Sequence, residues 1–287
     1  MGKILYLECN SGISGDMTVG ALLDLGADRQ VLENALESLG VDGYHLHFGR
    51  KVVSGLDAFD FDVHLEEHEH GHEEGHGHEE GHWHEDGHGH EHEHGHEAGH
   101  RHEAGHGHEV GHGHEHEHSH EAGHGHPHPH IHRNLHDIYH IIDRLDSNER
   151  VKEMARTMFR IVAEAESKAH GLPVEQVHFH EVGAIDSIVD IISAAVCIDN
   201  LGVEDVVISA LSEGHGHVHC QHGVLPVPVP ATANIASSYG LKLHFTDNDG
   251  EMVTPTGAAI AAALRTKDRL PSSCRLLKVG ICLLYTS

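Results

Sequence analysis

A histidine-rich tract, which runs from His68 to His132, interrupts this sequence and limits what the rest of the chain can fold into. The tract repeats Gly-His, His-Glu and Glu-Ala-Gly units around a single tryptophan, so it offers almost no apolar surface to bury. Burial of apolar surface is what offsets the conformational entropy lost on folding. We therefore expect residues 67–133 to be a disordered insert, and the segments on either side of it to fold together.

The segments outside the tract predict a mixture of helices and strands. Apolar residues at helical spacing indicate helices at about 16–26, 29–39, 134–146 and 148–169, from Ile185 to Val196, around Thr232 and after Thr254. Strand patterns occur at 4–9 and 203–209, and alternation on both sides of Ser54-Gly55 predicts a β-hairpin of 44–52 and 56–65. We predict an α+β fold with a small mixed sheet flanked by helices. Its folded domain comprises residues 1–66 and 134–280, followed by an atypical tail at 281–287.

Charge and cysteine content exclude several classes of protein. The 46 Asp and Glu residues outnumber the 18 Lys and Arg residues, which gives a formal charge of −28 with neutral histidines. A nucleic-acid groove needs clustered Lys and Arg, so a nucleic-acid partner is not expected. Five scattered cysteines without a CxxC pair indicate neither a disulfide framework nor a zinc ribbon. We find no signal peptide or membrane-spanning apolar run, and we expect a soluble, cytoplasmic protein with no membrane partner.

The tract itself has the composition of a metal-binding segment. Imidazoles in His-x-His spacing on a glycine-rich chain can share one ion of nickel, zinc, copper or iron. Because a flexible chain imposes no single coordination geometry, we expect the tract to buffer metal without selecting among metals. A neutral linker of variable length is the alternative interpretation of the same residues.

Two glycine-containing turns are candidate anion sites. SGISGDM (Ser11 to Met17) lies between a predicted strand and a helix, and TPTG (Thr254 to Gly257) opens an alanine-rich helix. Backbone N–H groups at a helix start can bind a phosphate. A plain turn with helix capping by Ser14, Asp16 or Thr254 explains the same residues. The Walker A pattern GxxxxGK followed by Ser or Thr is absent, which weakens a GTPase hypothesis.

The stretch HFHEVGAIDSIVD contains a denser set of polar residues. His178, His180 and Glu181 precede a helix in which Asp186 and Asp190 are four residues apart. Two carboxylates at this spacing repel each other unless a cation or a donor lies between them, so a metal or a basic ligand would remove the conflict. A helix cap at Asp186 and a solvated Asp190 are the alternative.

A second set of metal-ligating residues lies outside the tract, in EGHGHVHCQHG. His217, His219, Cys220 and His222 combine imidazole with a thiolate, a ligand set that suits nickel, zinc or copper. An ordinary loop with a buried cysteine explains the stretch equally well.

Four stretches together resemble one known family. SGISGDM, HFHEVGAIDSIVDI, HGVLPVPVPAT and MVTPTGAAI occur in this order, with a histidine-rich insert after the first hairpin. In this combination the chain resembles the LarC family of nickel-insertion proteins over residues 3 to about 280. The resemblance implies a CTP-dependent nickel chelatase. Its substrate would be pyridinium-3,5-bisthiocarboxylic acid mononucleotide, and its product the nickel pincer cofactor of lactate racemase.

Such a reaction needs bound Ni²⁺, an anion site for the phosphate and a base for a ring proton. As catalytic residues we assign His178, His180 and Glu181. As cofactor-binding residues we assign Ser11, Gly12, Ser14, Gly15, Asp16, Thr254, Thr256 and Gly257. As metal ligands we assign His180, Glu181, Asp186, Asp190, His217, His219, Cys220 and His222.

The resemblance also implies partners beyond this chain. CTP with a divalent cation would be held by a C-terminal domain of the family, and the lactate racemase apoprotein would receive the product. The ending ICLLYTS does not follow the glycine-rich continuation expected after Gly280. We expect this chain alone to bind nickel and to turn over poorly without that domain. A homo-oligomer is left open, and a non-catalytic nickel or zinc storage protein or metallochaperone is the alternative function.

Overall fold

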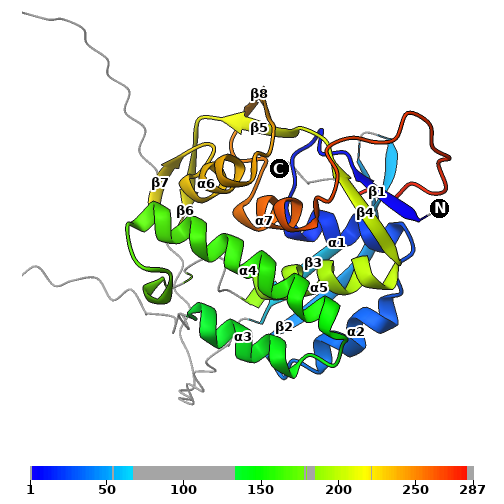
Figure 1. Ribbon diagram of the computed structural model, residues 1–287, viewed down its shortest axis with the longest axis horizontal. Helices are drawn as coiled ribbons and strands as arrows, with labels where there is room; N and C mark the ends of the chain where they lie inside the picture. The colour runs from blue at the N-terminus through cyan, green and yellow to red at the C-terminus, as the bar shows by residue number, and fades with distance from the viewer. Residues whose placement is uncertain are drawn as a thin grey trace, which may run out of the picture. The chain divides into compact units, whose positions relative to one another are not determined.

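The computed structural model describes residues 2–53, 55–66, 133–177, 179, 185–220 and 222–282 (Figure 1). Its α-helices are α1 (Gly15–Asp24), α2 (Arg29–Glu37), α3 (Leu135–Arg144), α4 (Glu149–His170), α5 (Ile185–Asn200), α6 (Pro230–Tyr239) and α7 (Pro255–Leu264). Its strands are β1 (Lys3–Leu7), β2 (Tyr44–Val53), β3 (Leu56–Leu65), β4 (Val203–Ile208), β5 (Leu211–His215), β6 (His217–Cys220), β7 (Gly223–Pro226) and β8 (Leu243–Asp249). A 3-10 helix, η1 (Val174–Gln176), follows α4. The predicted α+β class is confirmed, and residues 67–132 of the predicted disordered insert lie outside the described residues.

The strands pair two by two. β1 runs parallel to β4, with Lys3 opposite Val203, and β5 runs parallel to β8. The predicted hairpin is confirmed as β2 and β3, whose antiparallel register sets Phe48 opposite Phe61. β6 and β7 form a second hairpin. The β1–β4 pair joins the start of the chain to residues that follow the tract, so sequence from both sides of the tract builds one compact unit.

Helix α5 lies at the centre of the hydrophobic core. It packs against α1, α2 and α4, and Ile188 and Ile192 on its apolar face are almost completely buried (Figure 1). α1 contributes Leu22 and α4 contributes Phe159, both fully buried. Because burying such a side chain stabilises the fold by about 1.5 to 3 kcal/mol, these contacts fix how α5 is rotated. They thereby also fix the direction of the polar stripe of α5, which Asp186 and Asp190 form. No helix among the described residues has both the length and the apolarity needed to cross a membrane.

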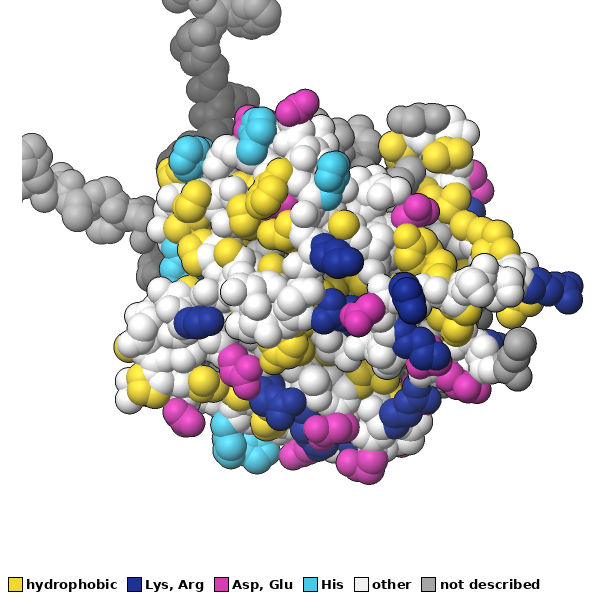
Figure 2. All heavy atoms as spheres, turned by 45° about the horizontal axis from the view of Figure 1, so that its top comes forward, with side chains coloured by type: hydrophobic (Ala, Val, Ile, Leu, Met, Phe, Trp, Pro, Cys, Tyr) yellow, Lys and Arg dark blue, Asp and Glu magenta, His cyan; other side chains and the backbone are white. Residues whose placement is uncertain are grey.

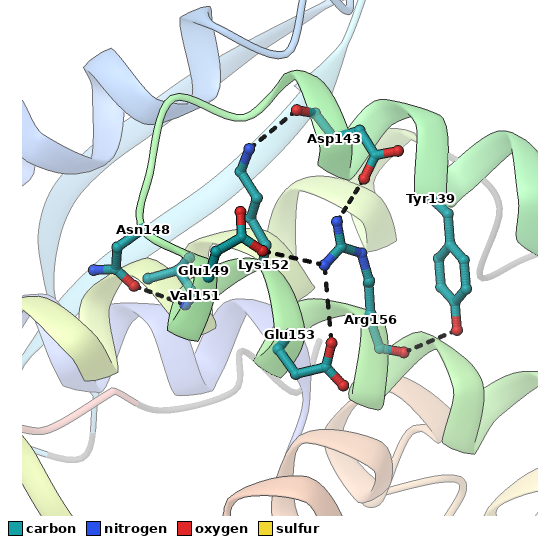
Figure 3. A network of polar contacts seen from close by, with 8 residues as sticks. All are labelled: Tyr139, Asp143, Asn148, Glu149, Val151, Lys152, Glu153 and Arg156. Carbon is teal, nitrogen blue, oxygen red and sulfur yellow. Dashed lines mark hydrogen bonds and ion pairs between the residues drawn. The ribbon is translucent and has the colours of Figure 1, made fainter.

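Helices α3 and α4 are linked by a polar network around Arg156 (Figure 3). The Arg156 guanidinium lies 2.5 Å from Asp143 Oδ1 on α3, and this hydrogen bond lowers the pKa of the Asp143 carboxyl below its usual value. The same guanidinium lies 3.8 Å from carboxylate oxygens of Glu149 and Glu153 on its own helix. Lys152 donates to the Asp143 carbonyl at 3.0 Å. The network therefore ties the end of α3 to the first turns of α4.

Two segments far apart in the sequence run side by side just before α1 and α7. The Ile13 N–H donates to the Met252 carbonyl at 2.9 Å, and the Thr254 N–H donates to the Ile13 carbonyl at 3.1 Å. Glycines allow this approach, since a Cβ at Gly12 would collide with the Met252 carbonyl and one at Gly257 with the Ile13 carbonyl. The N-termini of α1 and α7 are therefore neighbours.

A buried carboxylate supports the second of these segments. Glu213 on β5 is fully buried, and its Oε1 accepts hydrogen bonds from the N–H groups of Gly214 at 2.9 Å, Met252 at 2.8 Å and Val253 at 3.3 Å. Its Oε2 has no hydrogen-bond partner among the described residues. Because hydrogen bonds to a charged acceptor are stronger than neutral ones, Glu213 holds the segment before α7 in place.

We predict that Glu213→Gln lowers the free energy of unfolding by about 1 to 3 kcal/mol, as measured by urea denaturation. The amide weakens the three hydrogen bonds and places an NH₂ group where Oε2 is buried without a partner. Glu204→Gln is the matched control, because Glu204 is exposed on β4, the strand that precedes β5 in the sequence. A change of less than about 0.5 kcal/mol for Glu213→Gln would show that the carboxylate has no supporting role.

Candidate functional site

A cavity of about 280 Å³ opens where α1, α5 and α7 begin. These three helices contact one another and lie close together in the middle of Figure 1. Their N-terminal ends carry partial positive charge, because the first N–H groups of a helix have no acceptor within it. The cavity is lined by Ser14, Gly15, Asp16, Asp62, Val63, Asp186, Ser187, Asp190, Glu251, Thr254, Pro255 and Thr256.

At the start of α1, the side chains do not cap the helix in the usual way. Ser14 occupies the N-cap position, but its side chain accepts no capping hydrogen bond and instead donates one to Asp16 Oδ1. Gly15 packs directly against the Asp190 carboxylate, which a Cβ at this position would displace. The capping interpretation of Ser14 is therefore wrong in its detail, and the turn leaves its backbone close to the cavity.

Asp190 of α5 is the most strongly perturbed carboxyl group in the cavity. Burial raises its pKa well above the usual value, and the charges of Asp16 and Asp186 raise it further. A backbone hydrogen bond from Asp16 opposes these effects without cancelling them. Asp190 Oδ1 is buried and has no hydrogen-bond partner among the described residues. A buried oxygen of this kind costs free energy unless a proton or a ligand satisfies it.

Asp186 lies one turn before Asp190 on the same face of α5. Burial raises the pKa of Asp186, although the backbone N–H groups of Ser187 and of Asp186 itself donate to its carboxylate and lower it. Asp186 Oδ1 is also buried without a partner among the described residues. The alternative that Asp190 is simply solvated is therefore wrong, because α5 directs both carboxylates inward.

The cavity collects negative side-chain charge. Asp16, Asp62, Asp186, Asp190 and Glu251 line it, and none of the lining residues that the structure describes is Lys, Arg or His. Two like charges 4 Å apart repel by about 4 kcal/mol near a protein surface. Three helix N-termini offset part of this repulsion. The arrangement suits a bound cation, with an anionic group of the same ligand at the helix ends.

The start of α7 supplies the opposite wall. Thr254 is its N-cap, and Thr254 Oγ1 accepts a hydrogen bond from the Gly257 N–H at 3.1 Å, as the capping interpretation predicted. Pro255 occupies the first helical position, where a missing N–H costs nothing. Thr256 is 7% exposed and lines the cavity. Its hydroxyl and the adjacent backbone are suited to an anion.

Three of the predicted motifs thus meet at one cavity. Seven residues that we assigned from the sequence line it, namely Ser14, Gly15, Asp16, Asp186, Asp190, Thr254 and Thr256. Ser11, Gly12 and Gly257 are not lining residues, although Gly12 and Gly257 make the close backbone contacts that shape it. His178, His180 and Glu181 lie outside the described residues.

The histidine and cysteine group of residues 217–222 lies elsewhere, on the β6–β7 hairpin. Side chains alternate along a strand, so His217 and His219 share one face of β6 while Cys220 is on the other. The His222 ring lies beside that of His170 of α4 in a tilted arrangement, with ring centroids 5.0 Å apart. None of these residues lines the cavity. In Figure 2, histidine side chains lie at separate points of the visible face, some near its top and others toward its lower left.

A preformed metal centre is not present in the described part of the chain, where no three His, Cys, Asp or Glu side chains are arranged to hold an ion. The metal ligands that we assigned from the sequence therefore stay predictions. Two acidic residues of the cavity were missed: Asp62 on β3 and Glu251 before α7. The strand alternation marked Asp62 as polar, but nothing local in the sequence indicated that β3 passes beside α5.

We predict that the metal-free protein becomes less stable, relative to Asp190→Asn, as pH rises above about 4, where the unfolded aspartate ionises. The folded state holds a proton on Asp190 at pH values where the unfolded state has already lost it, so stability falls through that window. Urea denaturation in the presence of a chelator measures the difference. The tract is the same in both proteins, so its contribution to the difference cancels. Parallel stability curves would contradict the burial of this carboxyl group.

Comparison with known proteins identifies relatives over nearly the whole chain. A family model described as nickel insertion protein matches residues 5–285. The chain is 50% identical over 281 residues to the pyridinium-3,5-bisthiocarboxylic acid mononucleotide nickel insertion protein of Alkaliphilus metalliredigens, covering 98% of this chain and 56% of that protein. It is 38% identical over 258 residues to the protein of the same name from Geobacillus kaustophilus, covering 90% and 50%.

A putative nickel insertion protein of Geobacter metallireducens is 38% identical over 266 residues, covering 92% of this chain and 52% of that protein. The chain therefore spans about half the length of the curated relatives it matches. No solved structure matches it. Because the family model matches almost every residue, the chain belongs to the nickel insertion protein family.

Proposed function

We propose that the cavity binds Ni²⁺ together with pyridinium-3,5-bisthiocarboxylic acid mononucleotide, and that the protein inserts the metal into this compound. The observation that best supports the proposal is the meeting of five carboxylates and three helix N-termini at one cavity. The carboxylates suit a metal cation, and the helix ends suit a phosphate. Two of the relatives are named as nickel insertion proteins for this same compound.

Nickel is the cargo of this reaction, and we assign Asp16, Asp186 and Asp190 to it. The buried Oδ1 atoms of Asp186 and Asp190 lack partners among the described residues, and a metal ion would satisfy them. Carboxylates alone do not distinguish nickel from magnesium, because both ions accept oxygen ligands. Selectivity therefore has to come from softer ligands. His180, which precedes α5 in the sequence, and the two thiocarboxylates of the mononucleotide would supply them.

We assign the phosphate of the mononucleotide to the N-termini of α1 and α7. Gly15 keeps the α1 backbone free of a side chain on the cavity wall, and Thr256 places a hydroxyl on the opposite wall. Backbone N–H groups and helix dipoles favour an anion at such ends by about 0.3 to 1 kcal/mol per charge. The cavity volume of about 280 Å³ is near the lower end for small-molecule sites, which favours one mononucleotide over a larger ligand.

The insertion step breaks one ring C–H bond and forms a carbon–nickel bond, so a base must accept the released proton. His178, His180 and Glu181 are our candidates for this base. We further propose that CTP with a divalent cation is used by the half of the longer relatives that this chain does not cover. The product would then pass to the lactate racemase apoprotein in the cytoplasm.

The charges of the cavity imply an order of binding. The mononucleotide carries a phosphate and two thiocarboxylates besides its cationic ring, so the acidic side chains of the cavity repel it overall. Bound Ni²⁺ reduces that repulsion and offers a ligand position to each sulfur. We therefore propose that nickel binds before the mononucleotide.

We predict that Ni²⁺ raises the affinity for nicotinic acid mononucleotide, a pyridinium carboxylate with the same phosphate, by at least about tenfold. Isothermal titration calorimetry of the full chain with and without Ni²⁺ measures this change. Asp190→Asn should lose most of the nickel dependence, whereas Asp268→Asn, a change at an exposed residue outside the cavity, should keep it. Equal affinity with and without nickel would contradict the proposed order.

We predict that the double variant Asp186→Asn and Asp190→Asn lowers nickel insertion by about 100-fold or more, because it removes two proposed metal ligands. The assay combines this chain with the remaining half of a long relative, the dithio-mononucleotide, Ni²⁺, Mg²⁺ and CTP, and detects the nickelated product by mass spectrometry. Asp268→Asn serves as the control again. Unchanged insertion by the double variant, or no product when the intact relative is active, would overturn the proposal.

A further inference from the structure

The outer face of the β2–β3 hairpin carries a group of metal-ligating side chains whose histidines no part of the proposed reaction uses. In the antiparallel register His45 is opposite His64, and His47 is opposite Asp62. Residues directly opposite each other share one face of a sheet, so these four side chains are neighbours. The apolar residues between them, such as Phe61, are buried on the inner face. The hairpin thus presents three imidazoles and a carboxylate on one exposed surface.

One distance in this group is close to that between two ligands of the same ion. His64 Nε2 lies 3.4 Å from Asp62 Oδ2, and the His47 and His64 rings have centroids 5.9 Å apart. The His45 and His64 rings are stacked with centroids 5.0 Å apart. Two ligand atoms bound at about 2.1 Å to the same metal lie about 3.0 to 3.4 Å from each other. The His64–Asp62 pair already has this spacing.

The group is not a finished metal centre, since no three such side chains in the described ranges are yet arranged to hold an ion. The His47 and His64 side chains are both 48% exposed, and that of Asp62 is 60% exposed. Exposed side chains change rotamer at little cost, so the three can close around an ion. A weak site that forms by rotation releases its ion quickly, which is what a transfer step needs.

An ordinary polar strand face would explain exposed histidines, but it would not explain the place of Asp62. Asp60, the next acidic residue on the same face, lies 2.6 Å from Lys51 Nζ and 3.5 Å from His47 Nε2, so it is already paired with a lysine. Asp62 instead contacts His64 and also lines the acidic cavity. One carboxylate therefore belongs both to the histidine group and to the wall of the candidate nickel site.

The position of the hairpin in the sequence supplies the source of metal. β3 ends at Leu65, and His68, the first histidine of the tract, is four residues from His64. The tract therefore begins directly after the hairpin in the sequence.

We propose that His47, His64 and Asp62, with His45 beside them, form a transfer site that passes a divalent metal ion from the tract to the acidic cavity. The ligand is a borderline cation such as Ni²⁺, because imidazole and carboxylate are its usual protein ligands. The destination of the ion rests on the proposed function. The presence of the site itself does not.

Histidine footprinting tests the site without any insertion chemistry. The full chain is treated with diethyl pyrocarbonate with and without enough Ni²⁺ to protect the tract, and modified peptides are quantified by mass spectrometry. We expect Ni²⁺ to slow the modification of His47 and His64 at least tenfold. His244, an exposed histidine on β8, should change by less than twofold.

Two matched variants test the role of the carboxylate. Asp62→Asn should reduce the protection of His47 and His64 to less than threefold, whereas Asp57→Asn should leave it unchanged. Asp57 is on the same strand, and its side chain is 61% exposed, close to the 60% of Asp62.

Unprotected His47 and His64 beside a protected tract would overturn the transfer site, as would full protection in Asp62→Asn. Protection as expected, together with failure of nickel insertion, would refute the proposed function and leave the site standing.

Discussion

The contact between Ile13 and the segment Met252–Thr254 is the constraint on which the candidate site depends. Two backbone hydrogen bonds join these segments, which are about 240 residues apart in the sequence. Gly12 and Gly257 have no side chain that would keep the two segments apart. The buried Glu213 carboxylate holds the second segment by accepting hydrogen bonds from the N–H groups of Met252 and Val253. Without this contact, the N-termini of α1 and α7 would not share a wall with the polar stripe of α5.

Charge explains how such a site can combine two kinds of ligand. Five carboxylates around one cavity lower the stability of the metal-free protein, because burial and mutual repulsion both disfavour the charged form of Asp190 and raise its pKa. A cation removes that cost, and the three helix ends then favour an anion beside it. The binding of the cation therefore depends on the negative charge of the carboxylates, and the binding of the anion depends on the cation already bound. Carboxylates give it little metal selectivity, so selection has to come from nitrogen and sulfur ligands.

Local sequence patterns predicted the helices and turns that carry the site better than the strands and the tertiary contacts around them. The spacing of Asp186 and Asp190 placed both on one face of a helix, and the turns around Gly15 and Thr254 were correctly placed before helices. The strands β5 to β7 were missed, because glycine, histidine and proline take the place of β-branched residues in much of 211–226, and β8 was missed as well. Asp62 and Glu251 reach the cavity through tertiary packing alone, which no spacing rule encodes. The predicted bases at 178, 180 and 181 lie outside the described residues.

The central claim is that the folded part of the chain, and not the histidine-rich tract, provides the selective site. The most direct measurement is calorimetric titration of Ni²⁺, followed by nicotinic acid mononucleotide, into a variant that lacks residues 68–132 and whose folding is verified by circular dichroism. The account predicts saturable nickel binding that is lost in the same variant carrying Asp190→Asn, and mononucleotide binding that requires the metal. A folded variant that binds neither ligand would contradict it.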